Sequence, residues 1–267
     1  MRVLFRKLRF STILFTLLLP ALLLPARPAG AQESSQQAVP LTAEDLVQGA
    51  MDYWRGTSSI ATMRMTIHRP DWERRMTMVI WTKGREDSVF KVTEPAKDKG
   101  NATLKLDREM WTYNPKVNRT IKIPPSMMSQ SWMGSDFSNN DLSKSDSLTV
   151  DYDHELIGSE VVDGVTVYEI KCMPKPGAPV VWGMQTVKVR EDYIMTEEIF
   201  YDEDFLPVKR LAAQEIKPMG GRLFPVVWVM TVDGEEGFTR LDYLELAFDV
   251  DVPERYLSLE WLKAPVR

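Results

Sequence analysis

A long series of strand-like segments joined by short turns runs from Met63 to Phe248 and most constrains the fold. Two early segments alternate strictly in character. Apolar Met63, Met65 and Ile67 are interleaved with polar residues, and Met76, Met78 and Ile80 repeat the pattern. Such alternation is typical of a strand with one buried face. Since most connections have two to five residues, the sequence predicts an antiparallel array rather than parallel strands with crossover helices.

The remaining strands are predicted from the same pattern and from turn signals such as Asp163-Gly164 and Asp233-Gly234. They fall at residues 88–92, 103–106, 111–113, 119–123, 154–161, 165–173, 185–190, 196–201, 208–215, 224–232 and 239–248. No linker divides the array, so we expect one domain over residues 41–267. The fold class is mainly β with a minor helical part (α+β).

Helices are predicted only at the two ends of this array. Thr42 is placed as an N-cap, the apolar residues from Leu46 to Trp54 recur at helical spacing, and Gly56 ends the helix. A short C-terminal helix is predicted from Pro253, a proline suited to the first helical turn, through Leu262.

The strand pattern fails between residues 124 and 148. This stretch contains Pro124-Pro125, Gly134 and Asn139-Asn140, and it carries an unusual number of soft apolar side chains. These are Met127, Met128, Trp132, Met133 and Phe137. A long irregular excursion is uncommon in a compact domain unless it is functional, and a lid is one such function. The segment is therefore predicted to cover a site.

The N-terminus has the features of a cleavable secretory signal peptide over residues 1–31. Basic residues precede an apolar run of about fifteen residues, which is short for a membrane span, and Ala29-Gly30-Ala31 supplies a small-x-small cleavage site. A polar linker follows over residues 32–40. The single cysteine, Cys172, lies far from the cleavage site, so we expect a periplasmic protein without a lipid anchor.

The charge balance limits the class of partner. Residues 1–31 hold five basic and no acidic residues, so their removal leaves 28 basic and 38 acidic residues, a net charge of about −10. An acidic chain of this kind argues against nucleic acid as a partner and against adsorption to anionic lipid.

Few residues are suited to catalysis or to holding a metal. The mature chain has two histidines, His68 and His154, and neither has a metal-like partner at useful spacing. The acidic stretch around His154, residues 151–155, is either a cation site or a solvated turn. Cys172 lies in a strand pattern, where a buried thiol is the ordinary interpretation and a nucleophile the alternative. We expect no enzyme activity, no cofactor and no metal.

Methionine and tryptophan are the stronger signal. Fourteen methionines and all eight tryptophans lie in the mature chain. Methionines on strand faces either pack a core or form an adaptable binding surface. One helix at each end is too little to cover the array, so either the sheet closes on itself or an apolar ligand fills its concavity.

Several segments resemble the LolA-like outer-membrane lipoprotein-sorting proteins of Gram-negative bacteria. They cover most of the mature chain: residues 98–105 (DKGNATLK), 110–115 (MWTYNP), 119–128 (RTIKIPPSMM), 131–137 (SWMGSDF), 140–142 (NDL) and 252–263 (VPERYLSLEWLK).

The resemblance implies an unclosed, strongly curved antiparallel β-barrel whose helices form a lid over a hydrophobic cavity for acyl chains. It implies cargo that passes from an inner-membrane transporter to an outer-membrane acceptor. Family carriers lock the lid with an arginine, and Arg64, Arg74 and Arg75 are the candidates here.

The leading hypothesis is therefore a monomeric periplasmic carrier of lipoprotein or lipid acyl chains. The expected cavity wall is Met63, Met65, Met76, Met78 and Ile80, and the expected lid or mouth is Met127, Met128, Trp132, Met133 and Phe137. Two alternatives remain open: an adaptor for a lipid-exporting transmembrane pump, and an assembly module that binds proteins and has a filled core.

Overall fold

The computed structural model describes residues 41–143 and 146–265, so the expected signal peptide and linker lie outside it. Thirteen strands form one antiparallel sheet. They are β1 (Ser58–Arg69), β2 (Trp72–Lys83), β3 (Asp87–Glu94), β4 (Ala102–Leu106), β5 (Glu109–Asn114), β6 (Arg119–Lys122), β7 (Tyr152–Val162), β8 (Val165–Pro174), β9 (Met184–Arg190), β10 (Met195–Tyr201), β11 (Pro207–Met219), β12 (Arg222–Val232) and β13 (Phe238–Phe248). Each predicted strand is present, and the mainly β class is confirmed.

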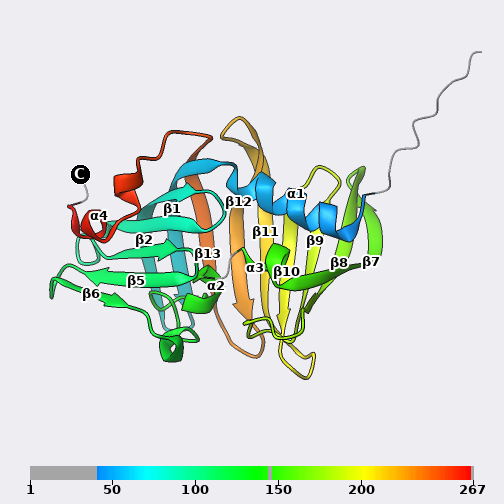
Figure 1. Cartoon of the computed structure of the whole chain (residues 1–267), viewed down its shortest axis with the longest axis horizontal. Helices are drawn as coiled ribbons and strands as arrows, with labels where there is room; N and C mark the ends of the chain where they lie inside the picture. The colour runs from blue at the N-terminus through cyan, green and yellow to red at the C-terminus, as the bar shows by residue number, and fades with distance from the viewer. Residues whose placement is uncertain (1–40, 144–145, 266–267) are drawn as a thin grey trace, which may run out of the picture. The chain divides into compact units, whose positions relative to one another are not determined.

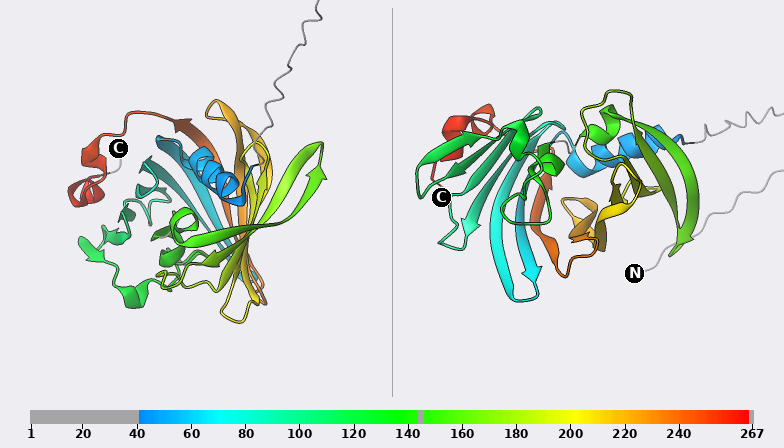
Figure 2. Two further views of the ribbon diagram at one scale, coloured as in Figure 1. Left: turned by 45° about the vertical axis from the view of Figure 1, so that its right-hand side comes forward. Right: turned by 90° about the horizontal axis from the view of Figure 1, so that it is seen from below.

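The sheet is open. Its strand order is β6-β5-β4-β3-β2-β1-β13-β12-β11-β10-β9-β8-β7, so β6 and β7 are its two edges and do not pair with each other. The first and last strands, β1 and β13, join the two halves. The sheet curves around the N-terminal helix α1 (Ala43–Arg55), as Figures 1 and 2 show. The predicted incomplete barrel is therefore confirmed.

The alternating methionines occupy the inner, concave face. Met63 pairs with Met78 and Met65 with Met76 across β1 and β2, and all four side chains are buried. The intervening Arg64 is exposed on the other face. Successive side chains of a strand point to opposite faces, so this register places the whole methionine set inside the curve.

The helix α1 covers the inner face of the other half of the sheet. Thr42 caps it, since its side chain accepts a hydrogen bond from the Asp45 backbone, and the Asp45 carboxylate accepts one from the Thr42 backbone in return. The Asp45 carboxylate accepts hydrogen bonds from the Thr42 hydroxyl and from the Thr42 backbone N–H, and these two bonds hold the pKa of Asp45 below its usual value. Leu46, Val47 and Ala50 are buried against strands β7 to β12. The predicted helix and its N-cap are confirmed.

Residues 123–151 connect the two edge strands, and we call them the connecting segment. The sequence of this stretch shows no strand or helix periodicity. In the structure it forms three short helical turns: η1 (Pro125–Met127), α2 (Asn139–Ser143) and α3 (Ser147–Val150). Between them lies a tight turn in which Met133 and Gly134 both have positive φ, with the Trp132 backbone N–H donating to the Phe137 carbonyl at 2.7 Å. This turn brings Trp132 and Phe137 together.

The C-terminal helix is shorter than expected. The region from Pro253 to Leu262 divides into η2 (Glu254–Tyr256) and α4 (Leu259–Lys263). Ser258 is extended and caps α4 by accepting from the Trp261 backbone, so it starts a new helix instead of continuing the first. α4 packs on the outer face against Val89 and Leu104. Among the described residues, no helix is long and apolar enough to cross a bilayer.

Candidate functional site

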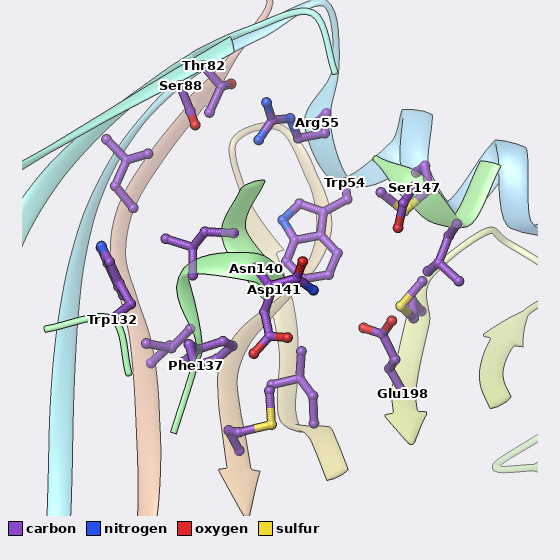
Figure 3. Close-up of a pocket in the computed structure, with 18 of the residues that line it drawn as sticks. Trp54, Arg55, Thr82, Ser88, Trp132, Phe137, Asn140, Asp141, Ser147 and Glu198 are labelled. Atoms are coloured by element: carbon purple, nitrogen blue, oxygen red, sulfur yellow. The ribbon is translucent and has the colours of Figure 1, made fainter. Parts of the chain in front are cut away.

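A cavity of about 210 Å³ lies between the inner face of the sheet, α1 and the connecting segment (Figure 3). An apolar cavity of about 150 Å³ in another protein admits benzene, so this space is large enough for part of an alkyl chain. Most of its lining is apolar and comes from both halves of the sheet. Representative lining residues are Met51, Trp54, Met63, Ile80, Phe90, Leu148, Met195, Phe200, Leu211, Met230, Leu241 and Leu246.

The structure divides the ten expected site residues into three groups. Met63, Ile80, Trp132 and Phe137 line the cavity. Met65, Met76 and Met78 are fully buried in the core beside it and do not reach its surface. Met127, Met128 and Met133 are partly buried and pack against that same core from the connecting segment. All ten thus belong to one apolar assembly, and four of them line the cavity.

Trp132 is the central contact of the connecting segment. Its side chain is buried, and its indole N–H donates to the Thr103 hydroxyl at 3.0 Å. The ring meets Phe90 edge to face with a centroid distance of 5.3 Å. Trp132 therefore fastens the segment to β3 and β4 and closes one wall of the cavity.

Four aspartates spaced five residues apart bind the connecting segment to cations elsewhere in the fold. The pairs are Asp136–Arg69 (2.6 Å), Asp141–Lys209 (2.9 Å), Asp146–Lys105 (3.4 Å) and Asp151–Arg108 (3.0 Å). Arg69 belongs to β1, Lys209 to β11 and Lys105 to β4, so the pairs reach both halves of the sheet. Each aspartate side chain is at least nine-tenths buried, so loss of its cationic partner would leave a buried carboxylate uncompensated, which costs more than breaking a surface pair.

The three candidate lid-locking arginines have different surroundings. Arg74 pairs with Asp98 at 2.9 Å and donates to the Met133 carbonyl at 3.2 Å, so it does contact the connecting segment. Arg75 pairs with Glu73 on the surface, and Arg64 is exposed. Sequence reasoning missed Arg69, the arginine with the most buried partner on the segment, because its partner lies 67 residues away.

Polar groups occupy one region of the cavity lining. Glu198 of β10 lies between Leu211 and Val187 on the neighbouring strands, with Asp141 facing it from the connecting segment (Figure 3). Burial, and to a lesser degree the charge of Asp141, raises the pKa of Glu198 to about 8. Nearby, Gln185 donates to the Tyr152 hydroxyl at 2.8 Å, and burial raises the pKa of that tyrosine.

Glu198 gives the folding stability a specific pH dependence. An acid whose folded pKa is raised loses its proton more easily in the unfolded chain, so stability declines as pH rises from about 4.5 to about 8 and then levels off. Glu198→Gln removes this contribution. We expect its stability relative to the parent protein to increase between pH 5 and pH 8, measured by urea denaturation. A relative stability that does not change with pH would contradict this assignment.

The remaining reactive residues have structural partners. One ring nitrogen of His154 lies 2.7 Å from the Leu148 carbonyl, and Asp151 pairs with Arg108. Burial raises the pKa of the Cys172 thiol, which lies in the core against α1. In the part of the chain that the structure describes, no cluster of three or more His, Cys, Asp or Glu residues could hold a metal ion.

Known proteins match this chain by fold and by family. The model of a family described as "Uncharacterized protein" matches residues 84–264. A DUF1329 family protein from Desulfovibrio piger is 25% identical over 82% of this chain and 98% of its own, with a TM-score of 0.74. No curated protein matches the sequence.

Two further solved structures share the fold. A structure described as an outer membrane lipoprotein-sorting protein domain, from Vibrio parahaemolyticus, is 20% identical over 83% of this chain and 98% of its own, with a TM-score of 0.71. A LolA superfamily protein from Nitrosomonas europaea is 21% identical over 82% and 99%, with a TM-score of 0.68. The chain belongs to the family described as "Uncharacterized protein", whose model matches residues 84–264. Its fold is that of the LolA-like outer-membrane lipoprotein-sorting proteins.

Proposed function

We propose that this protein is a periplasmic carrier that binds acyl chains of lipoproteins or lipids inside the curve of its sheet. One observation carries the proposal: an apolar cavity lies beneath a segment that joins the two open edges of the sheet. The LolA-like fold of the solved relatives supports it. The alternative of an assembly module requires a filled core, and the cavity favours the carrier.

The physical need for such a protein follows from the cost of exposing hydrocarbon to water. Each buried CH₂ group contributes about 0.8 kcal/mol, so an acyl chain of ordinary length loses on the order of 10 kcal/mol on entering water. A carrier must shield the chain and still release it. An open sheet edge and a cover held by side-chain contacts meet both demands. We further propose a transporter in the inner membrane as donor and an outer-membrane acceptor.

Filling the cavity tests the carrier function. Ala61 on β1 is buried and lines the cavity, so Ala61→Phe places a ring in the space that an acyl chain would occupy. We expect the affinity for a fluorescent fatty-acyl probe to fall by about tenfold or more, equivalent to about 1.4 kcal/mol. Overpacking costs about 1–3 kcal/mol of stability, so binding is measured per mole of folded protein.

Ala247→Phe is the matched control. Ala247 is exposed on β13, next in sequence to the cavity-lining Leu246 and therefore on the opposite face of the sheet. It should leave probe binding unchanged. Equal effects of the two substitutions, or a parent protein that binds no acyl probe and yields no lipid on solvent extraction, would rule out the carrier.

A further inference from the structure

Two carboxyl groups, those of Glu198 and Asp141, line a cavity whose other walls are mostly apolar. Glu198 points into it from β10, between the apolar side chains of Leu211 and Val187. Among the described residues, no hydrogen-bond donor reaches its carboxyl group. Glu198 is half-buried, and placing a carboxyl group among apolar side chains without a hydrogen-bond partner is unfavourable.

Asp141 is a second, independent indication. Its side chain is 5% exposed, and one oxygen, Oδ2, accepts from Lys209 at 2.9 Å and from the Ser138 backbone at 2.8 Å. The other oxygen, Oδ1, is buried and has no partner among the described residues. Figure 3 shows this carboxylate directed into the same space as Glu198. Buried polar atoms are nearly always satisfied, so an orphaned acceptor beside a cavity indicates a missing donor.

Gln185 supplies a third unpaired group. Its amide nitrogen donates to the Tyr152 hydroxyl, while its oxygen is buried without a partner. If the amide is turned over, the oxygen meets Tyr152 and the nitrogen is left free, so in either orientation one atom is available to a ligand.

The charges around this region select the kind of ligand. Lys209 is occupied by Asp141 and lies over the Trp182 ring at 5.3 Å. Arg55, a cation that does line the cavity, donates to the carbonyls of Gly84 and Asp87 and lies away from Glu198 in Figure 3. Once Glu198 has lost its proton, above its pKa of about 8, the groups without partners are mainly hydrogen-bond acceptors, and two of them are carboxylates. An anionic head group would meet repulsion here.

We propose that Glu198, Asp141 and Gln185 form a polar subsite for the head of an acyl ligand that donates hydrogen bonds and carries no negative charge. Hydroxyl, amine and amide N–H groups satisfy this requirement, whereas carboxylates and phosphates do not. The subsite rests on the proposed carrier function and adds a selectivity that an apolar cavity alone lacks. The hydrocarbon occupies the apolar lining, and the head pairs with the three side chains.

The test compares three amphiphiles of equal chain length: decanol, decylamine and decanoate. Each displaces the apolar fluorophore N-phenyl-1-naphthylamine from the full mature chain at pH 9, where Glu198 is mostly ionised. We expect decanol and decylamine to displace it at about tenfold lower concentration than decanoate. Glu198→Leu should reduce this preference to twofold or less. Glu197→Leu is the matched control, because Glu197 faces the other way and pairs with Arg210.

Glu198→Gln keeps the size of the side chain and serves if the leucine variant fails to fold. It should weaken decylamine binding and strengthen decanoate binding. In the parent protein, the affinity for decylamine should rise with pH as Glu198 ionises near pH 8. The titratable and charged groups near Glu198, which are Asp141 with Lys209, Tyr152 and Cys172, are retained in Glu198→Gln, in which this rise should be absent.

The outcomes separate the two proposals. If the fluorophore does not bind the parent protein, the carrier function fails. If it binds, but decanoate displaces it as well as decanol does, or Glu198→Leu leaves the preference intact, the cavity is an unselective apolar site and the polar subsite is wrong.

Discussion

Arg69→Ala should destabilise the protein by about 3 kcal/mol, measured as the free energy of unfolding in urea. Arg69 binds Asp136 through two nitrogens, at 2.6 and 3.3 Å, and the Asp136 side chain is only 3% exposed. Its removal leaves a buried carboxylate whose remaining side-chain partner is the Thr239 hydroxyl at 2.6 Å. An uncompensated buried charge costs far more than the loss of a surface pair.

Arg75→Ala is the matched control, since Arg75 is 67% exposed and pairs with Glu73 on the surface. It should cost about 0.5 kcal/mol or less. The double variant Arg69→Ala with Asp136→Asn removes the orphaned charge and should recover part of the loss. A loss for Arg69→Ala no larger than for Arg75→Ala would show that this ion pair does not fasten the connecting segment.

The strands could be predicted from the sequence because their signal is local. Alternation in β1 and β2 and the short turns between strands depend only on neighbouring residues, and the N-cap at Thr42 depends on its own helical turn. The C-terminal helix was predicted too long because Pro253 and Leu262 are both suited to helix. The break depends on Ser258, whose role as an N-cap was not recognised.

The site was harder to predict because its contacts are distant in sequence. The four aspartates at 136, 141, 146 and 151 are visible as a pattern, yet their partners lie between 41 and 68 residues away. Met65 and Met63 carry the same sequence signal, yet of the two only Met63 lines the cavity, whose walls come from elements distant in sequence. Glu198 follows Glu197, and strand alternation directs one of the two inward. The local sequence does not show which of the two glutamates points inward.

Trp132→Ala should lower the free energy of unfolding by about 3 kcal/mol and also weaken acyl binding. The ring is buried against Phe90, its N–H is bonded to Thr103, and it lines the cavity. Truncation therefore removes packing, one buried hydrogen bond and part of the site at once. Trp132→Phe retains most of the packing and should cost about 1 kcal/mol, leaving the Thr103 hydroxyl without its donor.

Trp72→Ala is the control for Trp132→Ala, because Trp72 is 49% exposed, and it should change stability and binding little. Binding per mole of folded Trp132→Ala separates the two roles of this residue. Affinity reduced severalfold would place Trp132 in the ligand site, whereas unchanged affinity with lost stability would make it a structural anchor of the connecting segment. The first result is expected, because the ring is at once a wall of the cavity and the contact that positions its cover.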